Sequence, residues 1–272
     1  RSRMTGKQAF TFTVFSPTAM KSVVEARAPG FERETGGRPV FDFAPSGRQA
    51  KRIADGEFAD VVISTAGAIE DLAARGFIVA GSGAALVRSP IGAAVAAGGR
   101  RYAIGTPEGL RQAALDARAI AMSHPDHGAQ SGAHMMRVFE TLGIAGIVRD
   151  KAVFGMGGPA NLIGKFLLRG EADLGFQQMS ELIAVDGIDI LGTLPAELQL
   201  FTTFSAGITT RSRNRAGAAQ WIDWLRDPQT RPAIEAAGML PPSAADSFAA
   251  PGPSFDTPRS RGATQDEGKL NQ

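Results

Sequence analysis

Strand-like and helical segments alternate along the first third of the chain, and this alternation limits the fold more than any other feature. Three apolar runs, each followed by a helical pattern, are expected at residues 10–15, 39–44 and 60–64, with helices at about 18–28, 47–55 and 67–76. Pro29-Gly30 is expected to end or kink the first of these helices. Strands and helices that alternate across short loops predict a mostly parallel sheet with helices on both faces.

The same alternation restarts after Arg88. Further strands and helices are expected at 91–97, 106–117, 119–122, 132–143, 160–170, 173–177 and 188–194, followed by a strand at 202–209 and two closing helices. The chain is long enough, at 272 residues, for two lobes with cores of their own. We therefore predict an α/β fold of two lobes with mainly parallel central sheets.

The two lobes are expected to be linked by two strands that cross between them, near 86–95 and 200–209. Residues 8–88 and 204–242 would form the first lobe, and residues 89–203 a second lobe inserted into it. Residues 243–272 are rich in Pro, Gly, Ser and Asp and show little periodicity. This composition predicts a disordered tail.

Composition excludes several classes of function. Lysine and arginine number 29 against 27 acidic residues, and no run combines basic and aromatic side chains, so nucleic acid is not an expected partner. The chain has no cysteine, which excludes disulfides and thiolate metal sites. Its first ten residues contain no hydrophobic signal core. Either a signal preceded this numbering and the protein is periplasmic, or Met4 is the native start and the protein is cytoplasmic.

Four predicted helices begin with small polar residues or glycine, in the stretches SPT, PSG, AQSG and GMGGPAN at 16–18, 45–47, 129–132 and 155–161. A helix start presents unpaired N–H groups and about half a positive charge. Starts that follow parallel strands gather at the carboxyl edge of the sheet. Each stretch alone also fits an ordinary helix cap. Together they predict an anion-binding cleft between the lobes.

Lys21, Arg48 and His134 are expected in the first turns of their helices, where a cation costs about 0.3–1 kcal/mol. A bound polyanion would turn this penalty into attraction; alternatively, the long side chains swing out to solvent. His124, His127 and His134 are separated by turn residues that fix no common face, so we expect no metal. The chain has no phosphate-binding glycine loop of the nucleotide type, and we expect no cofactor.

The stretch FAPSGRQAKRIADGEFADVVIS, residues 43–64, resembles the molybdate-binding, type 2 periplasmic solute-binding proteins without a gap. Weaker matches include VFSPTAMKSVV, HPDHGAQSGAHMMRVFETLGI and WIDWLRDP, and the similarity covers residues 8–242. In that family two hinged lobes close on a tetrahedral oxyanion held by hydroxyl and backbone N–H groups. The resemblance implies ligand-binding roles for Ser16 or Thr18, Ser46, Gln130 or Ser131, the segment 159–161 with Asn161, and Gln178, which replaces a tyrosine donor of the family.

The variant GFQQMSEL also resembles members described as aconitate isomerases. A glutamine at 178, with Lys21 and Arg48 nearby, favours carboxylates at least as much as molybdate or tungstate. We therefore predict a monomeric solute-binding protein that captures a small multiply charged anion for ABC-type uptake. An ABC permease is a possible partner. The alternative is an isomerase that shifts a proton along a tricarboxylate, with His134 or His124 as base and Lys21 and Arg48 as stabilising cations. A cytoplasmic anion sensor is a third candidate.

Overall fold

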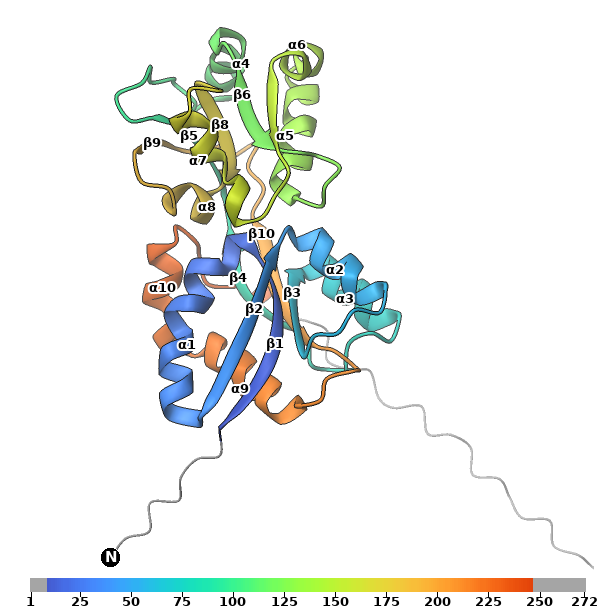
Figure 1. The fold of residues 1–272 in the computed structure, drawn as a ribbon. Helices are drawn as coiled ribbons and strands as arrows, with labels where there is room; N and C mark the ends of the chain where they lie inside the picture. Colours follow the sequence, from blue (N-terminus) through green and yellow to red (C-terminus); the bar gives the residue numbers. More distant parts are fainter. Residues whose placement is uncertain (1–8, 247–272) are drawn as a thin grey trace, which may run out of the picture.

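The computed structural model describes residues 9–246, which contain two five-stranded sheets (Figure 1). The first sheet has the order β2-β1-β3-β10-β4, made of Gly37–Ala44, Phe10–Pro17, Val61–Thr65, Thr202–Ile208 and Ala84–Ser89. The second has the order β7-β6-β8-β5-β9, made of Ala152–Gly155, Ile120–Ser123, Leu174–Gln178, Ile91–Ala96 and Ile188–Thr193. We call each sheet with its helices a lobe. The predicted fold class is confirmed.

Both sheets are mixed. β1 pairs in parallel with β2 and β3, and β6 pairs in parallel with β7 and β8. The remaining pairs are antiparallel, because β10 in the first sheet and β5 in the second run against both of their neighbours. The predicted parallel strands thus form three of the five strands of each sheet, and they direct their carboxyl ends toward the other lobe.

Helices cover both faces of each sheet. Those of the first lobe are α1 (Lys21–Thr35), α2 (Ser46–Ala54), α3 (Ala66–Ala74), α9 (Arg215–Arg226) and α10 (Arg231–Ala236). Those of the second are α4 (Pro107–Asp116), α5 (Gln130–Thr141), α6 (Ala145–Asp150), α7 (Ile163–Leu168) and α8 (Met179–Ile183). Short 3₁₀ turns are η1 (Thr18–Met20), η2 (Pro159–Asn161), η3 (Pro228–Thr230) and η4 (Ala244–Asp246). The sequence did not predict α6, β7 or α8.

Packed aromatic rings form part of the hydrophobic core of the first lobe. Trp221 of α9 is fully buried, and its ring lies 5.1 Å from that of Phe31 and 6.2 Å from that of Phe12. Phe31 belongs to the part of α1 beyond Pro29, so the expected end of the helix there is wrong: α1 continues to Thr35. Burial of Phe31, worth about 1.5–3 kcal/mol, offsets much of the penalty of about 3 kcal/mol for proline inside a helix.

The chain changes lobes twice. β4 and β5 are separated only by Pro90, and the segment 194–201 leads from β9 back to β10. Gln199, in the second crossing, is hydrogen-bonded to Ile91, in the first. Its Oε1 accepts from the backbone N–H of Ile91 at 3.0 Å, and its Nε2 donates to the Ile91 carbonyl at 2.9 Å. Figure 1 shows β10 (orange) reaching the junction between the two halves.

The predicted disordered tail begins too early. Residues 244–246 form the turn η4, and Asp246 accepts a hydrogen bond from the Thr203 hydroxyl at 2.6 Å. The rest of that prediction, residues 247–272, lies outside the described residues. No helix within 9–246 combines the length and hydropathy needed to cross a membrane.

Candidate functional site

A cavity of about 30 Å³ lies between the lobes, where the loops after β1, β2, β6, β7 and β8 meet. It is lined by Pro17, Thr18, Ala19, Pro45, Ser46, Ser123, Ala129, Gln130, Ser131, Gly157, Gly158, Gln178, Glu181 and Phe204. Both lobes contribute, since residues 17–46 come from the first sheet and residues 123–181 from the second. This edge is where parallel strands are expected to place a ligand.

The helices that begin at the cavity lack caps of their own. Within residues 9–246, six α-helices have nine residues or more. Side chains cap α3, α4 and α9, through Thr65, Thr106 and Asn214. The other three, α1 with its leading turn η1, α2 and α5, have no side-chain cap and no acidic residue in the first turn. In α2 the N–H of Gly47 donates to the Gly128 carbonyl. The remaining first-turn N–H groups and the partial positive charges of these helix starts have no compensating side chain at the cavity.

Two buried polar atoms in the cavity wall have no hydrogen-bond partner among the described residues: Thr18 Oγ1 and Gln178 Oε1. Thr18 is 7% exposed and Gln178 3%. Gln178 Nε2 donates to the Thr202 hydroxyl at 3.1 Å. Because that hydroxyl can also donate, turning the amide over keeps the contact and presents the NH₂ group instead. Unpaired buried polar groups are rare, so these two indicate a missing polar ligand.

Glu181, in the first turn of α8, is the one carboxyl group among the lining residues of the cavity. Its side chain is half-buried and, within the described chain, forms no hydrogen bond or ion pair. Desolvation raises the pKa of Glu181 from 4.5 to about 8. The group is therefore mostly neutral at pH 7 and presents an O–H donor to an anion.

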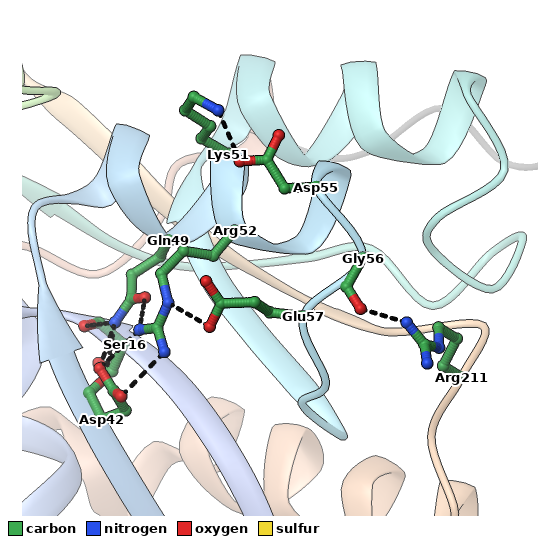
Figure 2. A network of polar contacts seen from close by, with 9 residues as sticks. All are labelled: Ser16, Asp42, Gln49, Lys51, Arg52, Asp55, Gly56, Glu57 and Arg211. Carbon is green, nitrogen blue, oxygen red and sulfur yellow. Dashed lines mark hydrogen bonds and ion pairs between the residues drawn. The ribbon is translucent and has the colours of Figure 1, made fainter.

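A polar network behind α2 holds the loop after β1 (Figure 2). Gln49 Nε2 donates to the carbonyls of Ser16 at 3.1 Å and Asp42 at 2.7 Å, which ties β1, β2 and α2 together. Arg52 makes two hydrogen bonds to the Asp42 carboxylate, at 2.8 and 3.1 Å, and lies over the Phe15 ring. The hydrogen bond from Arg52 lowers the pKa of Asp42. This network fixes the positions of Thr18 and Ser46 from behind.

The lobes touch around the cavity. The backbone N–H of Gly47 donates to the Gly128 carbonyl at 2.9 Å, and the Ser180 hydroxyl donates to the Ala19 carbonyl at 2.7 Å. At Gly157, where φ is +83°, a Cβ atom would lie 2.2 Å from Pro45 Cγ. Only glycine fits this approach without displacement. The structure is therefore of the closed form.

The structure brings together five of the predicted ligand-binding residues: Thr18, Ser46, Gln130, Ser131 and Gln178. It places two others elsewhere. Ser16 is fully buried behind the cavity with its hydroxyl on the Pro17 carbonyl, and Asn161 Nδ2 donates to the Gly157 carbonyl. In the fourth loop it is Gly157 and Gly158, not residues 159–161, that line the cavity.

None of the predicted cationic or catalytic side chains lines the cavity. Arg48 is exposed, and His134 Nε2 lies 2.7 Å from the Leu198 carbonyl in the segment that crosses between the lobes. His124 borders a separate cavity beside Phe154. Lys21 lies in a neighbouring groove of about 280 Å³, here called the outer groove, which is defined by Thr18, Lys21, Ser22, Glu25, Pro159, Leu162, Lys165, Ser180, Glu181 and Ala184.

Sequence reasoning missed Ser123 and Glu181 as lining residues, whereas Gly157 and Gly158 lie in the stretch 155–161 that it placed at the cleft. Ser123 follows a predicted strand directly, so the rule that gathers polar residues at the carboxyl edge would have found it. Glu181 gave no such signal, because α8 was not predicted and nothing placed its side chain.

The chain matches the family model of bacterial extracellular solute-binding proteins over residues 12–240. An aconitate isomerase from a Pseudomonas species is 31% identical over 238 residues, which cover 85% of this chain and 88% of that relative. The periplasmic molybdate-binding protein of Azotobacter vinelandii has a similar structure, with a TM-score of 0.72, 24% identity, and coverage of 85% of this chain and 100% of that one. The sulfate-binding protein SubI of Mycobacterium tuberculosis aligns with a TM-score of 0.69 at 14% identity, over 87% of this chain and 88% of that one.

Structural neighbours below 25% identity support the fold. The match to the family model covers most of the chain, and the relative at 31% identity covers 85% of it. The chain belongs to the family of bacterial extracellular solute-binding proteins.

Proposed function

We propose that this protein captures a small multiply charged anion in the cavity between its lobes, as the solute-binding component of an ABC-type uptake system in the periplasm. One observation carries the proposal: Thr18 Oγ1 and Gln178 Oε1 are buried without partners in a cavity where α1, α2 and α5 begin uncapped. An anion there would receive hydrogen bonds from the N–H groups of these helix starts and from Ser46 and Ser131.

The donors suffice for tight binding. A micromolar dissociation constant corresponds to about 8 kcal/mol, and a charge-assisted hydrogen bond contributes roughly 1.5–3 kcal/mol. Several such bonds reach that value after the costs of association. Binding therefore requires no catalytic group.

A carboxylate is favoured over an oxyanion as the ligand. The relative at 31% identity is an aconitate isomerase, whereas the molybdate- and sulfate-binding neighbours are too distant in sequence to indicate a ligand. The neutral Glu181 can donate a hydrogen bond to either class of anion, so the preference rests on the relative.

A thermal-shift screen tests the proposal. Molybdate, tungstate, sulfate, phosphate, citrate and the two aconitate isomers are added separately to the full chain, and a ligand at a hundred times its dissociation constant adds about 2.7 kcal/mol of stability. Ser46→Ala should weaken the ligand found by about 1–3 kcal/mol in calorimetry. If no anion stabilises the protein, or if Ser46→Ala binds as well as the wild type, the proposal is wrong.

An isomerase is the second candidate, and Glu181 is the observation that favours it. A carboxyl group with a pKa of about 8 exchanges protons readily near neutral pH. Its carboxylate form would remove a proton from the CH₂ carbon of an allylic tricarboxylate. The C–H electrons would form the new double bond, the old one would shift its electrons to the far carbon, and that carbon would take the proton back. The step needs no oxidant or reductant.

Glu181 thus takes the role of base that the sequence suggested for His134. The test is to follow cis-aconitate by NMR with wild type and with Glu181→Gln. Conversion that is lost in Glu181→Gln, while citrate still binds, supports the enzyme. If the wild type binds aconitate stoichiometrically but does not convert it, the isomerase is excluded and the binding function remains.

A further inference from the structure

The outer groove adjoins the cavity through two shared residues. Thr18 and Glu181 line both spaces, so no other residue separates the two at that point. Just beside this boundary the Ser180 hydroxyl, which lines the groove, donates to the carbonyl of Ala19, which lines the cavity. The groove is far larger than the cavity, at about 280 against 30 Å³.

The cavity alone is too small for a polycarboxylate. One water molecule needs at least about 10–15 Å³ measured in this way, so 30 Å³ accommodates two or three oxygen-sized atoms. That is the size of one carboxylate group. A ligand with a carbon chain and a second carboxylate needs further space, and the outer groove is the space that shares Thr18 and Glu181 with the cavity.

Two lysines from opposite lobes line the groove. Lys21 begins α1 and pairs with Glu25 one turn later, with its Nζ 5.2 Å from the centre of the Phe43 ring. Lys165 lies on α7, and its Nζ donates to the Pro159 carbonyl at 2.9 Å. The Lys21 pair is half-exposed on both sides, and such i,i+4 pairs contribute little, so a ligand carboxylate can take over the ammonium group at low cost.

We propose that the cavity and the outer groove form one two-part site for a short-chain acid with at least two carboxylates, one in the cavity and another between Lys21 and Lys165. The inference rests on the proposed binding of an anion in the cavity. The carbon chain then passes Glu181, the unpartnered carboxyl at the boundary. The outer carboxylate bridges cations of both lobes and so favours the closed form.

Calorimetry on the full chain tests the two-part site, with citrate and with tricarballylate, the saturated analogue of aconitate; a proton shift can convert neither acid. Lys165→Met and Lys21→Met should each raise the Kd of both acids about tenfold. Lys51→Met removes an equally charged lysine of α2 whose side chain is 73% exposed outside both spaces, and should leave the Kd within twofold. Lys165→Gln keeps a donor for the Pro159 carbonyl but removes the charge, so it should bind as weakly as Lys165→Met; wild-type affinity in Lys165→Gln would show that the charge takes no part.

Ser46→Ala distinguishes failure of this inference from failure of the proposed function. If neither acid binds the wild type, the two-part site is refuted, while binding in the cavity is decided by the other anions of the thermal-shift screen. If Ser46→Ala has no effect on either acid, binding in the cavity is refuted and the two-part site with it. If Ser46→Ala weakens both acids but Lys165→Met and Lys21→Met match Lys51→Met, the cavity binds the anion and the groove takes no part. Melting temperatures of the free variants confirm that each is folded.

Discussion

Thr18 and Gln178 show how single atoms indicate a site. A buried hydroxyl without a partner costs free energy in the ligand-free protein, and that cost is recovered only when a ligand supplies the missing hydrogen bond. Thr18 Oγ1 meets this description, whereas the equally buried Thr230 donates its hydroxyl to the Trp224 carbonyl at 3.0 Å.

Thr18→Val should therefore stabilise the free protein by about 1 kcal/mol and weaken the ligand by about 1–3 kcal/mol. Thr230→Val, the matched control, should lose about 1 kcal/mol of stability and leave the affinity unchanged. Thermal unfolding and calorimetry measure both effects. A Thr18→Val protein that is less stable than the wild type would contradict an unpaired hydroxyl at this position.

Glu181 should make stability depend on pH. Its pKa is raised from 4.5 to about 8 in the folded protein, so the folded state holds a proton more tightly than the unfolded state between these values. Its contribution to stability is complete below pH 4.5 and is lost as the pH rises toward 8. The charged groups that share the groove with it are Lys21, Glu25 and Lys165.

The free wild type should lose on the order of 2 kcal/mol between pH 5 and 8.5 through this group, which lowers the melting temperature by roughly 4–8 °C. Glu181→Gln should remove that slope, and Glu70→Gln, an exposed carboxyl of α3, should keep it. Equal slopes in the wild type and Glu181→Gln would show that the carboxyl is ionised as in water.

At the scale of elements, the sequence predicted helix starts better than side-chain directions. Thr18 and Ser46 were found because helix starts after parallel strands lie at the same edge, whereas Gln178 was implied by the family resemblance alone. Arg48 was misplaced because a helix turns about 100° per residue, so two residues after Ser46 its side chain lies on the opposite face of α2. His134 lies one turn beyond Ser131, about 4.5 Å further along α5, where it meets the Leu198 carbonyl.

The loop between β7 and η2 should govern closure through Gly157. Gly157→Ala would place a Cβ against Pro45 of the other lobe, so the affinity should fall about tenfold or more. Gly143, which does not line the cavity, also has a positive φ, +70°, and no atom within 4 Å of an added Cβ. Gly143→Ala therefore carries similar backbone strain without the clash and should bind within about threefold of the wild type. Equal losses in the two variants would show that strain, not closure, is responsible.

For the whole molecule, the fold class was predictable, and the lobe boundaries stay a prediction. The alternation of strands and helices sufficed for the two lobes, because a parallel sheet must bury both faces. The degree of closure was not predictable from the sequence. Contacts such as that of Gly47 with Gly128 join loops more than 80 residues apart and leave no pattern in the sequence.

The hydrogen bond from Ser180 to Ala19 joins the lobes only when they are closed. Ser180→Ala should therefore weaken the ligand about three- to tenfold, with little change in the melting temperature of the free protein. Ser64→Ala, which removes a 2.8 Å bond to the Ser46 carbonyl within the first lobe, should lower the melting temperature instead. A lower melting temperature in free Ser180→Ala would mean that the lobes are already closed in solution without ligand.

The burial of Trp221 against Phe31 has a practical consequence for watching the lobes move. Both tryptophans of the chain, Trp221 and Trp224, lie on α9, and the chain has no cysteine. All indole fluorescence therefore originates in one lobe, and a dye on a single cysteine introduced into α4 would sit on the other. Energy transfer between them would report opening and closing in real time, without removing any native residue of the site.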